Sequence, residues 1–297
     1  MNAASEPLEI ASDRAEYRYP DFICIGAQKA GTTWLDKNLR RHPKLWLPPI
    51  KEVQYFNELY IRTSRTWTAR HRRDRGSAVL RQYFKKTLPE DWDYRRISVL
   101  GDIIASPISD RWYGRIFALA GPNQLCGEVC PDYALLPDAG IEHMLKLSPD
   151  VRIILSMRDP IDRAWSQLRM DIKRGQIKEL GEIETYAANR DVYLRSDYPK
   201  IIANWRRFVP EKNLLTIFMD DIDSAPNQVI ENICGFLGVP YRAERFAKAE
   251  NPIHAGEAHA MPESVNAIFK ERYRPIYEQM VSLYPEIGRA WTARHYG

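Results

Sequence analysis

The sequence predicts an α/β fold in which a central parallel β-sheet is flanked by helices. Three apolar, β-prone runs, at residues 22–25, 153–157 and 214–218, have the length and composition of buried parallel strands. The first two lead through short loops into segments with helical character. With 44% hydrophobic and 28% charged residues, the 297-residue chain is long enough for one large domain. We expect residues 19–297 to form that domain, after a flexible or loosely docked lead-in at residues 1–18.

The charge balance and the apolar content exclude several classes of protein. With 43 basic and 39 acidic residues the net charge is +4, too small to indicate a nucleic-acid-binding protein but suited to an anionic ligand. No apolar stretch approaches the length that spans a bilayer, and the polar N-terminus lacks the basic and apolar regions of a secretory signal. We therefore expect a cytoplasmic protein without a membrane span, whose four cysteines are reduced and mostly buried.

The first predicted strand ends in a loop framed by Gly26 and Gly31, after which Thr32 and Thr33 open a helix. Such an arrangement can hold an anion, because the loop amides point inward and the helix end carries roughly half a positive charge. The spacing resembles the P-loop of nucleotide-binding proteins, except that the lysine, Lys29, lies inside the glycine frame and not after it. Taken alone, a glycine loop of this kind is most often an ordinary strand–turn–helix connection.

A second phosphate-binding element is predicted at the end of the strand at residues 153–157. Asp159 is a good helix N-cap and Pro160 suits the first helical position, so Arg158 lies at the carboxyl edge of the sheet. Ser166 follows on the same helix, roughly 10 Å along its axis. An arginine fork and a serine hydroxyl placed in this way could hold opposite sides of one phosphate.

An acidic residue, Glu52, follows the glycine-framed loop at a short distance in the sequence. It comes after an apolar run at residues 44–47, which could be a further strand, and after a turn forced by Pro48 and Pro49. A carboxylate here could lie at the carboxyl edge of the sheet, where open α/β folds bind their ligands. A lone glutamate in this position would more often be a surface ion-pair partner.

Together these elements resemble the sulfotransferases of the heparan-sulfate and bacterial type, which use 3′-phosphoadenosine 5′-phosphosulfate (PAPS). The glycine-framed loop resembles the family's phosphosulfate loop, and residues 158–166 match its Arg-Asp-Pro-x-x-Arg-x-x-Ser element. Residues 51–56 resemble its Lys-Glu-x-x-Tyr/Phe-Phe motif, with Gln54 where bacterial members commonly have histidine. Residues 127–133 resemble a segment that lines the acceptor side, with Val129 where glycan sulfotransferases often have lysine.

The resemblance implies a P-loop-like fold and sulfonyl transfer from PAPS to a hydroxyl, or less readily an amine, of a small-molecule, lipid or saccharide acceptor. Adenosine 3′,5′-bisphosphate (PAP) would be released, and no metal ion is implied. Glu52 would be the general base, and Lys29 would follow the charge on the bridging oxygen. Tyr55, Phe56 and Tyr133 would lie on the acceptor side. The residues expected to hold the nucleotide are Gln28, Lys29, Ala30, Gly31, Thr32, Thr33, Trp34, Arg158 and Ser166.

The resemblance is weakest over residues 58–125 and 240–262. Residues 58–125 are expected to form a helical insertion on the acceptor side, and the arginine-rich part at 62–75 could face an anionic acceptor such as an acidic glycan or a lipid head group. A solvated surface is the more common role for such a run. Residues 251–262 lack the Arg-Lys-Gly stretch with which cytosolic sulfotransferases close over the nucleotide.

Two other functions fit parts of the sequence. A magnesium-dependent P-loop kinase or nucleotide phosphohydrolase would need Gly-Lys-Thr where the chain has Gly31-Thr32-Thr33. A non-catalytic nucleotide-binding adaptor would use residues 62–75 to bind an acidic partner. Turnover with the phosphosulfate donor distinguishes both from the sulfotransferase hypothesis.

Overall fold

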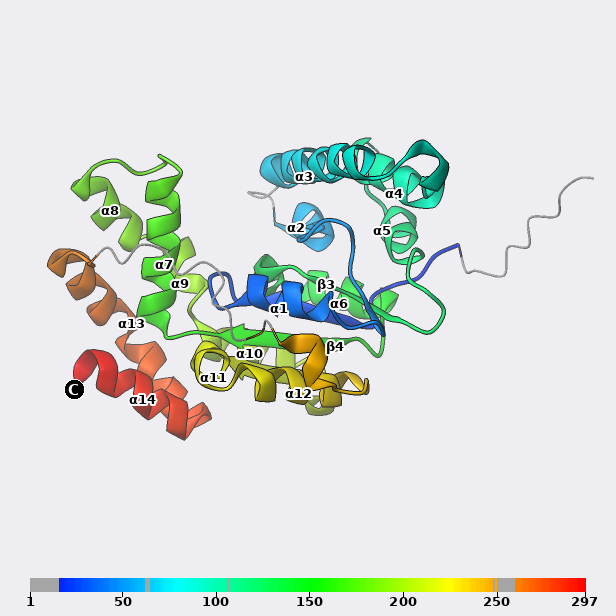
Figure 1. The fold of residues 1–297 in the computed structure, drawn as a ribbon. Coiled ribbons are helices and arrows are strands. Elements are labelled where there is room, and N and C mark those ends of the chain that lie inside the picture. The colour runs from blue at the N-terminus through cyan, green and yellow to red at the C-terminus, as the bar shows by residue number, and fades with distance from the viewer. Residues whose placement is uncertain (1–15, 62–64, 106, 248, 250–259) are drawn as a thin grey trace, which may run out of the picture.

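A parallel β-sheet forms the centre of the molecule in the computed structural model (Figure 1). The structure describes residues 16–61, 65–105, 107–247, 249 and 260–297. Within this part of the chain the sheet has five strands in the order β2-β3-β1-β4-β5, and every neighbouring pair is parallel. The strands are β1 (Phe22–Gly26), β2 (Leu45–Trp46), β3 (Leu125–Val129), β4 (Arg152–Met157) and β5 (Leu214–Phe218). The predicted α/β fold with a central parallel sheet is confirmed.

The register of the sheet brings the ends of the three central strands together. On β1, Cys24 pairs with Val129 of β3 and with Ile154 of β4. Gly127 allows this close approach, because a Cβ at that position would lie 2.4 Å from the carbonyl oxygen of Phe22. The segments that follow β1, β3 and β4 therefore leave the sheet at one edge.

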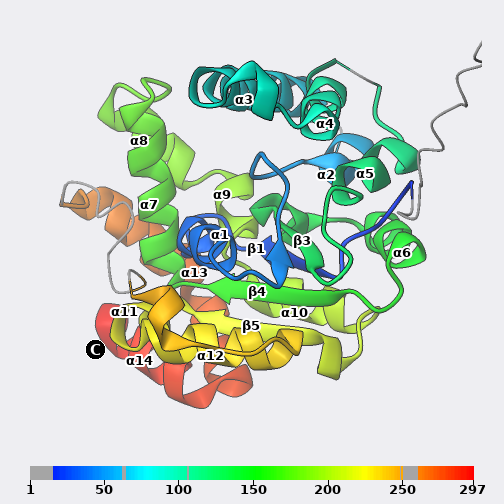
Figure 2. The same cartoon turned by 45° about the vertical axis from the view of Figure 1, so that its right-hand side comes forward.

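Helices cover both faces of the sheet, as Figure 2 shows. Successive side chains of β1 point to opposite faces. Ile23 and Ile25 belong to the larger buried cluster, and Phe22 and Cys24 belong to the smaller one. The smaller cluster is closed by α1 (Thr32–Leu39) and α12 (Pro226–Leu237). The larger one includes residues of α6 (Asp138–Leu147), α7 (Pro160–Lys173), α10 (Tyr198–Arg206) and α13 (Glu263–Leu283).

The segment expected to be a helical insertion is helical. α2 (Tyr55–Tyr60) leads into it, and it contains α3 (Arg65–Lys86), α4 (Tyr94–Ala105) and α5 (Asp110–Phe117). The longest of these helices, α3, runs for 22 residues. Polar and small residues replace an apolar stripe on its inner side. Arg72 forms an ion pair with Glu58 and lies over the ring of Trp112, and a Cβ on Gly76 would lie 2.8 Å from Ile104.

The C-terminal region is divided into two helices. It forms α13, which contains Pro275, and a separate α14 (Pro285–Tyr296). The break occurs because Tyr284 precedes a proline and has an extended φ of −139°. The smaller elements are α8 (Leu180–Ala187), α9 (Arg190–Leu194), α11 (Met219–Ser224) and the 3₁₀ turns Pro89–Asp91, Pro131–Leu135, Glu211–Asn213 and Ala243–Phe246.

The start of the described chain is attached to the domain. Arg18 forms an ion pair with Asp21 at 2.8 Å, and its backbone N–H donates to the carbonyl oxygen of Gly114 at 3.1 Å. The rest of the expected lead-in, residues 1–15, and most of the segment at 251–262 lie outside the described residues. Among the helices that the structure describes, none is both long and apolar enough to cross a membrane.

Candidate active site

The glycine-framed loop follows β1 at the carboxyl edge of the sheet, as expected. Ala27 donates its backbone N–H to the carbonyl oxygen of Ser156 on β4 at 2.6 Å, and the Ser156 hydroxyl donates to the carbonyl oxygen of Ala30. Lys29 and Gly31 have φ values of 70° and 80°, in the left-handed region that favours glycine. A Cβ on Gly31 would also lie 3.0 Å from side chains of α11. The loop is therefore held in one shape by the neighbouring strand.

The N-terminus of α1 opens onto this loop. Gly31 is its N-cap residue and offers no side-chain acceptor, and the first turn of α1 carries no acidic residue. The first N–H groups of a helix have no partner within the helix, and together they carry roughly half a positive charge. An anion at this position would accept hydrogen bonds from these N–H groups.

Lys51 connects the loop to the predicted base. Its Nζ donates to Oγ1 of Thr32 at 3.3 Å and to Oγ1 of Thr33 at 3.2 Å, and it lies 3.2 Å from Oε1 of Glu52. Glu52 and Gln54 both have φ values above 60°, so the backbone at these two residues adopts the left-handed conformation. The structure thus brings Glu52 to the mouth of the glycine-framed loop. Sequence reasoning quoted Lys51 only as part of a motif and gave it no role.

Lys29 lies in a group of basic side chains from the β4–α7 connection and α7. Its Nζ lies 3.8 Å from Sδ of Met170 on that helix. Burial lowers the pKa of Lys29, and three positive charges add to the effect, those of Arg174, Arg158 and Arg169. The carboxylate of Asp171 acts in the opposite direction. The excess of positive charge suits a bound anion, which would relieve the repulsion among these cations.

Arg158 and Ser166 are placed as predicted, at the β4–α7 connection and within α7. Asp159 caps the helix by accepting the backbone N–H of Ile161 at 3.0 Å, and Pro160 is the first helical residue. The side chains of Arg158 and Ser166 are half-buried, and within the described part of the chain the guanidinium of Arg158 has no ion-pair partner. Lys29 and Arg158 are close enough for the charge of one to affect the other.

Arg163, the second arginine of the predicted phosphate element, has a different role. It is fully buried, and its guanidinium donates to Oε1 of Gln167 and to the carbonyl oxygen of Val192, both at 2.8 Å. One of its nitrogens also lies 3.5 Å from the carbonyl oxygen of Gln28 in the glycine-framed loop. Arg163 therefore holds α7, α9 and the loop together.

Two other residues of the predicted nucleotide set point into the protein. Ala30 is fully buried, and the indole of Trp34 donates to the carbonyl oxygen of Ala249 at 2.8 Å. Oε1 of Gln28 is buried and has no hydrogen-bond partner among the described residues. Among Gln28, Ala30 and Trp34, Gln28 alone has a polar side-chain atom left for a ligand.

A second carboxyl group lies directly behind Glu52. Glu128, near the end of β3, accepts hydrogen bonds from the hydroxyl of Tyr113 at 2.5 Å and from the backbone N–H of Val53 at 3.3 Å. Burial, and to a smaller extent the charge of Glu52, raise the pKa of Glu128 to about 7, although these hydrogen bonds lower it. Sequence reasoning missed this residue. The signal available was a charged side chain in an otherwise apolar strand next to β1.

The three residues predicted on the acceptor side lie in the core beneath this segment. Tyr55 and Phe56 are 1% exposed and Tyr133 is fully buried. The ring of Phe56 packs edge-on against that of Tyr133, with centroids 5.4 Å apart, and the hydroxyl of Tyr55 donates to Asp110. These side chains support the Glu52 segment from below, and they offer no surface to a solvent-borne acceptor in this structure.

A group of possible metal ligands lies beside α7. Asp159, Asp162 and His295 each place one ligand atom within 4.8 Å of the others. A guanidinium nitrogen of Arg294 lies 3.3 Å from Oδ2 of Asp162 and 3.9 Å from Oδ2 of Asp159. These carboxylates therefore have a cationic partner within the protein, and they anchor α14 to the start of α7.

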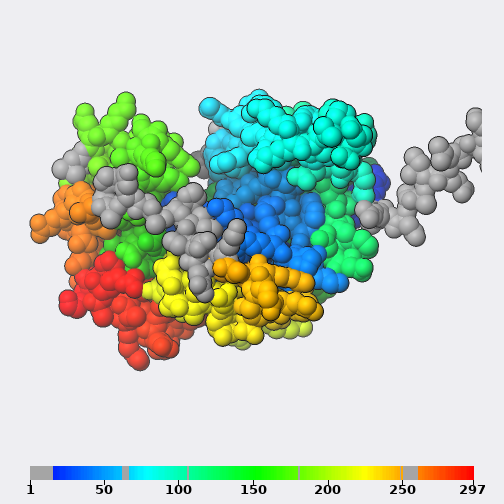
Figure 3. All heavy atoms as spheres, in the orientation of Figure 1, coloured from blue at the N-terminus to red at the C-terminus, as the bar shows by residue number. Residues whose placement is uncertain are grey.

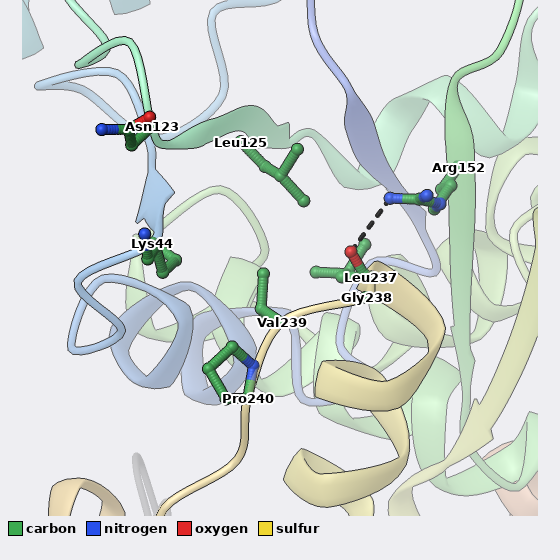
Figure 4. Close-up of a pocket in the computed structure, with 8 residues that line it drawn as sticks. All are labelled: Lys44, Asn123, Leu125, Arg152, Leu237, Gly238, Val239 and Pro240. Atoms are coloured by element: carbon green, nitrogen blue, oxygen red, sulfur yellow. Dashed lines mark hydrogen bonds between the residues drawn. The ribbon is translucent and has the colours of Figure 1, made fainter.

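A separate hollow of about 360 Å³ lies at the opposite, amino-terminal edge of the sheet (Figure 4). Leu125 and Arg152, the first residues of β3 and β4, line it, and Arg152 donates to the carbonyl oxygen of Leu237 at 3.0 Å. Neither the glycine-framed loop nor Glu52 lines this hollow. The candidate active site is therefore the group of residues at the carboxyl edge of the sheet.

Comparison with known proteins identifies the family of this chain. A family model described as the sulfotransferase family matches residues 20–243. The chain is 28% identical over 154 residues to the membrane-associated sulfotransferase kil1 of Dictyostelium discoideum, covering 52% of this chain and 23% of that protein. It is 22% identical over 242 residues to heparan sulfate glucosamine 3-O-sulfotransferase 6 of Mus musculus, covering 78% and 56%. The chain thus spans less than two thirds of the length of either relative.

Solved structures share the fold. A sulfotransferase from Alicyclobacillus acidocaldarius superposes with a TM-score of 0.63 at 20% identity, over 92% of this chain and 99% of that one. The sulfotransferase domain of the Synechococcus PCC 7002 olefin synthase gives 0.52 at 18% identity, over 88% and 90%. Mouse sulfotransferase SULT7A1, complexed with PAP, gives 0.50 at 14% identity, over 94% and 89%. Because the family model covers most of the chain, this protein belongs to the sulfotransferase family.

Proposed function

We propose that the protein transfers the sulfonyl group of PAPS to a hydroxyl group of an acceptor and releases PAP. The observation that carries this proposal is the position of Lys51, whose ammonium contacts both threonines at the start of α1 and the carboxylate of Glu52. A base at the mouth of an anion-binding loop is the arrangement that transfer from a bound phosphosulfate requires.

The nucleotide would be held at both ends. The 5′-phosphosulfate would lie against the loop at 28–33 and the N-terminus of α1, with Lys29 and Lys51 as its cationic partners. The 3′-phosphate would lie between Arg158 and Ser166, because an arginine fork matches the geometry of phosphate oxygens. The excess of positive charge around Lys29 supports this placement.

In the reaction, the acceptor oxygen forms a bond to sulfur while the bond from sulfur to the bridging phosphate oxygen breaks. Glu52 takes the proton of the acceptor hydroxyl, and the electron pair of the broken bond leaves with PAP. Lys29 and Lys51 stabilise the negative charge that grows on the leaving phosphate. Glu128 and Gln54 keep the Glu52 segment in place, since Val53 donates to Glu128 and Gln54 donates to Asp132 at 3.2 Å.

The acceptor that we propose is a hydroxylated saccharide, lipid or small molecule. The mouse relative is named for transfer to a glucosamine hydroxyl, which makes a saccharide one candidate. No metal is proposed, because the transferred sulfonyl group carries less charge than a phosphoryl group. The donor site that we propose consists mainly of loop amides and cationic side chains, which bind anions.

The test is transfer of labelled sulfonate from PAPS to a broad acceptor panel, with and without magnesium. We expect PAP release and a labelled product that do not depend on magnesium, and loss of both in Lys29→Ala. A preference for ATP and magnesium over PAPS would instead support the kinase or phosphohydrolase alternative. Tight PAPS binding without transfer to any acceptor would support the nucleotide-binding adaptor.

A further inference from the structure

The helix α3 concentrates positive charge. Residues 65–86 include eight basic residues and one acidic residue, a net charge of +7, whereas the whole chain carries +4. The rest of the protein is therefore net negative. A charge separation of this size directs one side of a protein toward an anionic partner.

Four basic side chains of α3 lie on the solvent side of the helix, together with two large aromatic residues. At 3.6 residues per turn, Arg72, Gly76 and Val79 face the body of the protein. Trp67 lies on the opposite side and Phe84 on the adjoining flank, near the two ends of the helix, and each is 39% exposed. The exposed basic residues on that outer face are Arg70, Arg73, Arg81 and Lys85. We refer to these six residues as the α3 outer face.

Further exposed apolar side chains follow at the turn between α3 and α4. Leu88 is 63% exposed and Tyr94 is 71% exposed. Of the five large apolar side chains that are exposed in the described part of the chain, four lie between residues 67 and 94. Single exposed apolar residues are ordinary, but two of these four lie on the most basic helix and the other two lie within the eight residues that follow it.

The α3 outer face is on the outside of the molecule. In Figures 1 and 2, α3 lies at the top of the molecule, and in Figure 1 α2 lies between it and the sheet. Figure 3 shows its atoms forming the upper surface of the molecule. Its 22 residues extend roughly 33 Å.

We propose that the α3 outer face docks this protein on the surface of an anionic lipid membrane. The basic side chains would contact headgroup phosphates, and Trp67, Phe84 and Leu88 would enter the interfacial region. An acidic polymer would bind the basic side chains of the α3 outer face but would leave these apolar side chains exposed to water. A lipid surface uses both features, and it requires no membrane-spanning helix.

Docking in this orientation would bring the active-site segment close to the membrane. On the side of α3 away from the outer face, Arg72 pairs with Glu58 of α2, the helix that follows Glu52 and Gln54. His71 lies with its Nε2 3.3 Å from the carbonyl oxygen of Lys51. The helix that contacts lipid would therefore also contact the residue that joins the donor loop to the base.

The experiment is co-sedimentation of the full-length protein with vesicles of phosphatidylcholine alone or with about one third phosphatidylglycerol. We expect binding to the anionic vesicles only, and weaker binding as the salt concentration rises. The variant Arg70→Glu/Arg73→Glu/Arg81→Glu/Lys85→Glu should lose at least about tenfold in affinity. The matched control reverses four exposed charges elsewhere, in Lys146→Glu/Lys200→Glu/Arg206→Glu/Lys212→Glu, and should bind nearly as well as the wild type.

A second variant, Trp67→Ser/Phe84→Ser, separates lipid from an acidic polymer. It should weaken vesicle binding severalfold and leave binding to a soluble heparin probe unchanged. All changed side chains are exposed, so melting temperatures should match the wild type. Failure of the wild type to bind anionic vesicles, equal losses in the α3 and control variants, or heparin binding through α3 without vesicle binding would each overturn the proposal.

Discussion

Lys51 Nζ lies 3.2 Å from Oγ1 of Thr33, across 18 positions of sequence. This contact joins the segment that carries Glu52 to the first turn of α1, which follows the glycine-framed loop. The same ammonium lies 3.2 Å from Oε1 of Glu52. One lysine therefore sets the position of the candidate base relative to the candidate donor site.

Replacing Lys51 with alanine should reduce both donor binding and turnover. The variant loses a cation beside the leaving phosphate and the contact that positions Glu52, so we expect kcat/KM for PAPS to fall by about 10²–10³. Steady-state kinetics with varied PAPS measures the effect. Lys44→Ala removes an exposed lysine at the opposite edge of the sheet and should keep wild-type kinetics. Equal rates for the two variants would rule out the role of Lys51.

Arg158 should recognise the 3′-phosphate of the nucleotide. We expect Arg158→Ala to weaken PAP binding by about 10–100-fold, while binding of adenosine 5′-phosphosulfate, which lacks the 3′-phosphate, changes little. Isothermal titration calorimetry with the two nucleotides measures the difference. The control is Arg152→Ala, at the other end of β4, where the side chain is bonded to Leu237. If Arg158→Ala weakened both nucleotides equally, the 3′-phosphate assignment would fail.

The buried carboxyl of Glu128 should make stability depend on pH. Burial raises the pKa of Glu128 from 4.5 to about 7 in the folded protein, so the native state holds this proton more tightly than the unfolded chain. The stabilising contribution is therefore complete below about pH 4.5 and is lost as the pH rises toward 7. The loss is on the order of 3 kcal/mol.

Urea unfolding between pH 5 and pH 8 checks this prediction. We expect Glu128→Gln to flatten the decline in the free energy of unfolding, because the amide carries no ionisable proton. The exposed Glu142→Gln should retain the wild-type slope. A wild-type slope in Glu128→Gln would show that other groups cause the pH dependence.

Much of this fold could be predicted from local sequence, since buried parallel strands and helix caps depend on neighbouring residues. The run that became β5, the Asp159 cap with Pro160, and the loop between Gly26 and Gly31 were all readable in this way. Gly31 combines a positive φ with a lack of room for a Cβ, which explains why a glycine marks the loop.

The missed features depend on contacts between distant segments. Glu128 accepts a hydrogen bond from the backbone N–H of Val53, 75 positions away, and this contact cannot be read from the residues around Glu128. The sequence around Lys51 does not show that its ammonium contacts Thr33, because the two residues are 18 positions apart and meet only in the folded protein. The long α3 was missed because Arg72 and Gly76 replace the apolar residues by which an amphipathic helix is usually detected.

The central claim is that Glu52 acts as the base for sulfonyl transfer from PAPS, and the Glu52→Gln variant tests it most directly. Turnover of labelled PAPS with a responsive acceptor should fall by about 10²–10⁴, while the Kd for PAP stays within about twofold of the wild type. Glu142→Gln serves as the control for removal of an exposed carboxylate. Wild-type turnover in Glu52→Gln would contradict the account, and so would a loss of activity explained entirely by lost PAP binding.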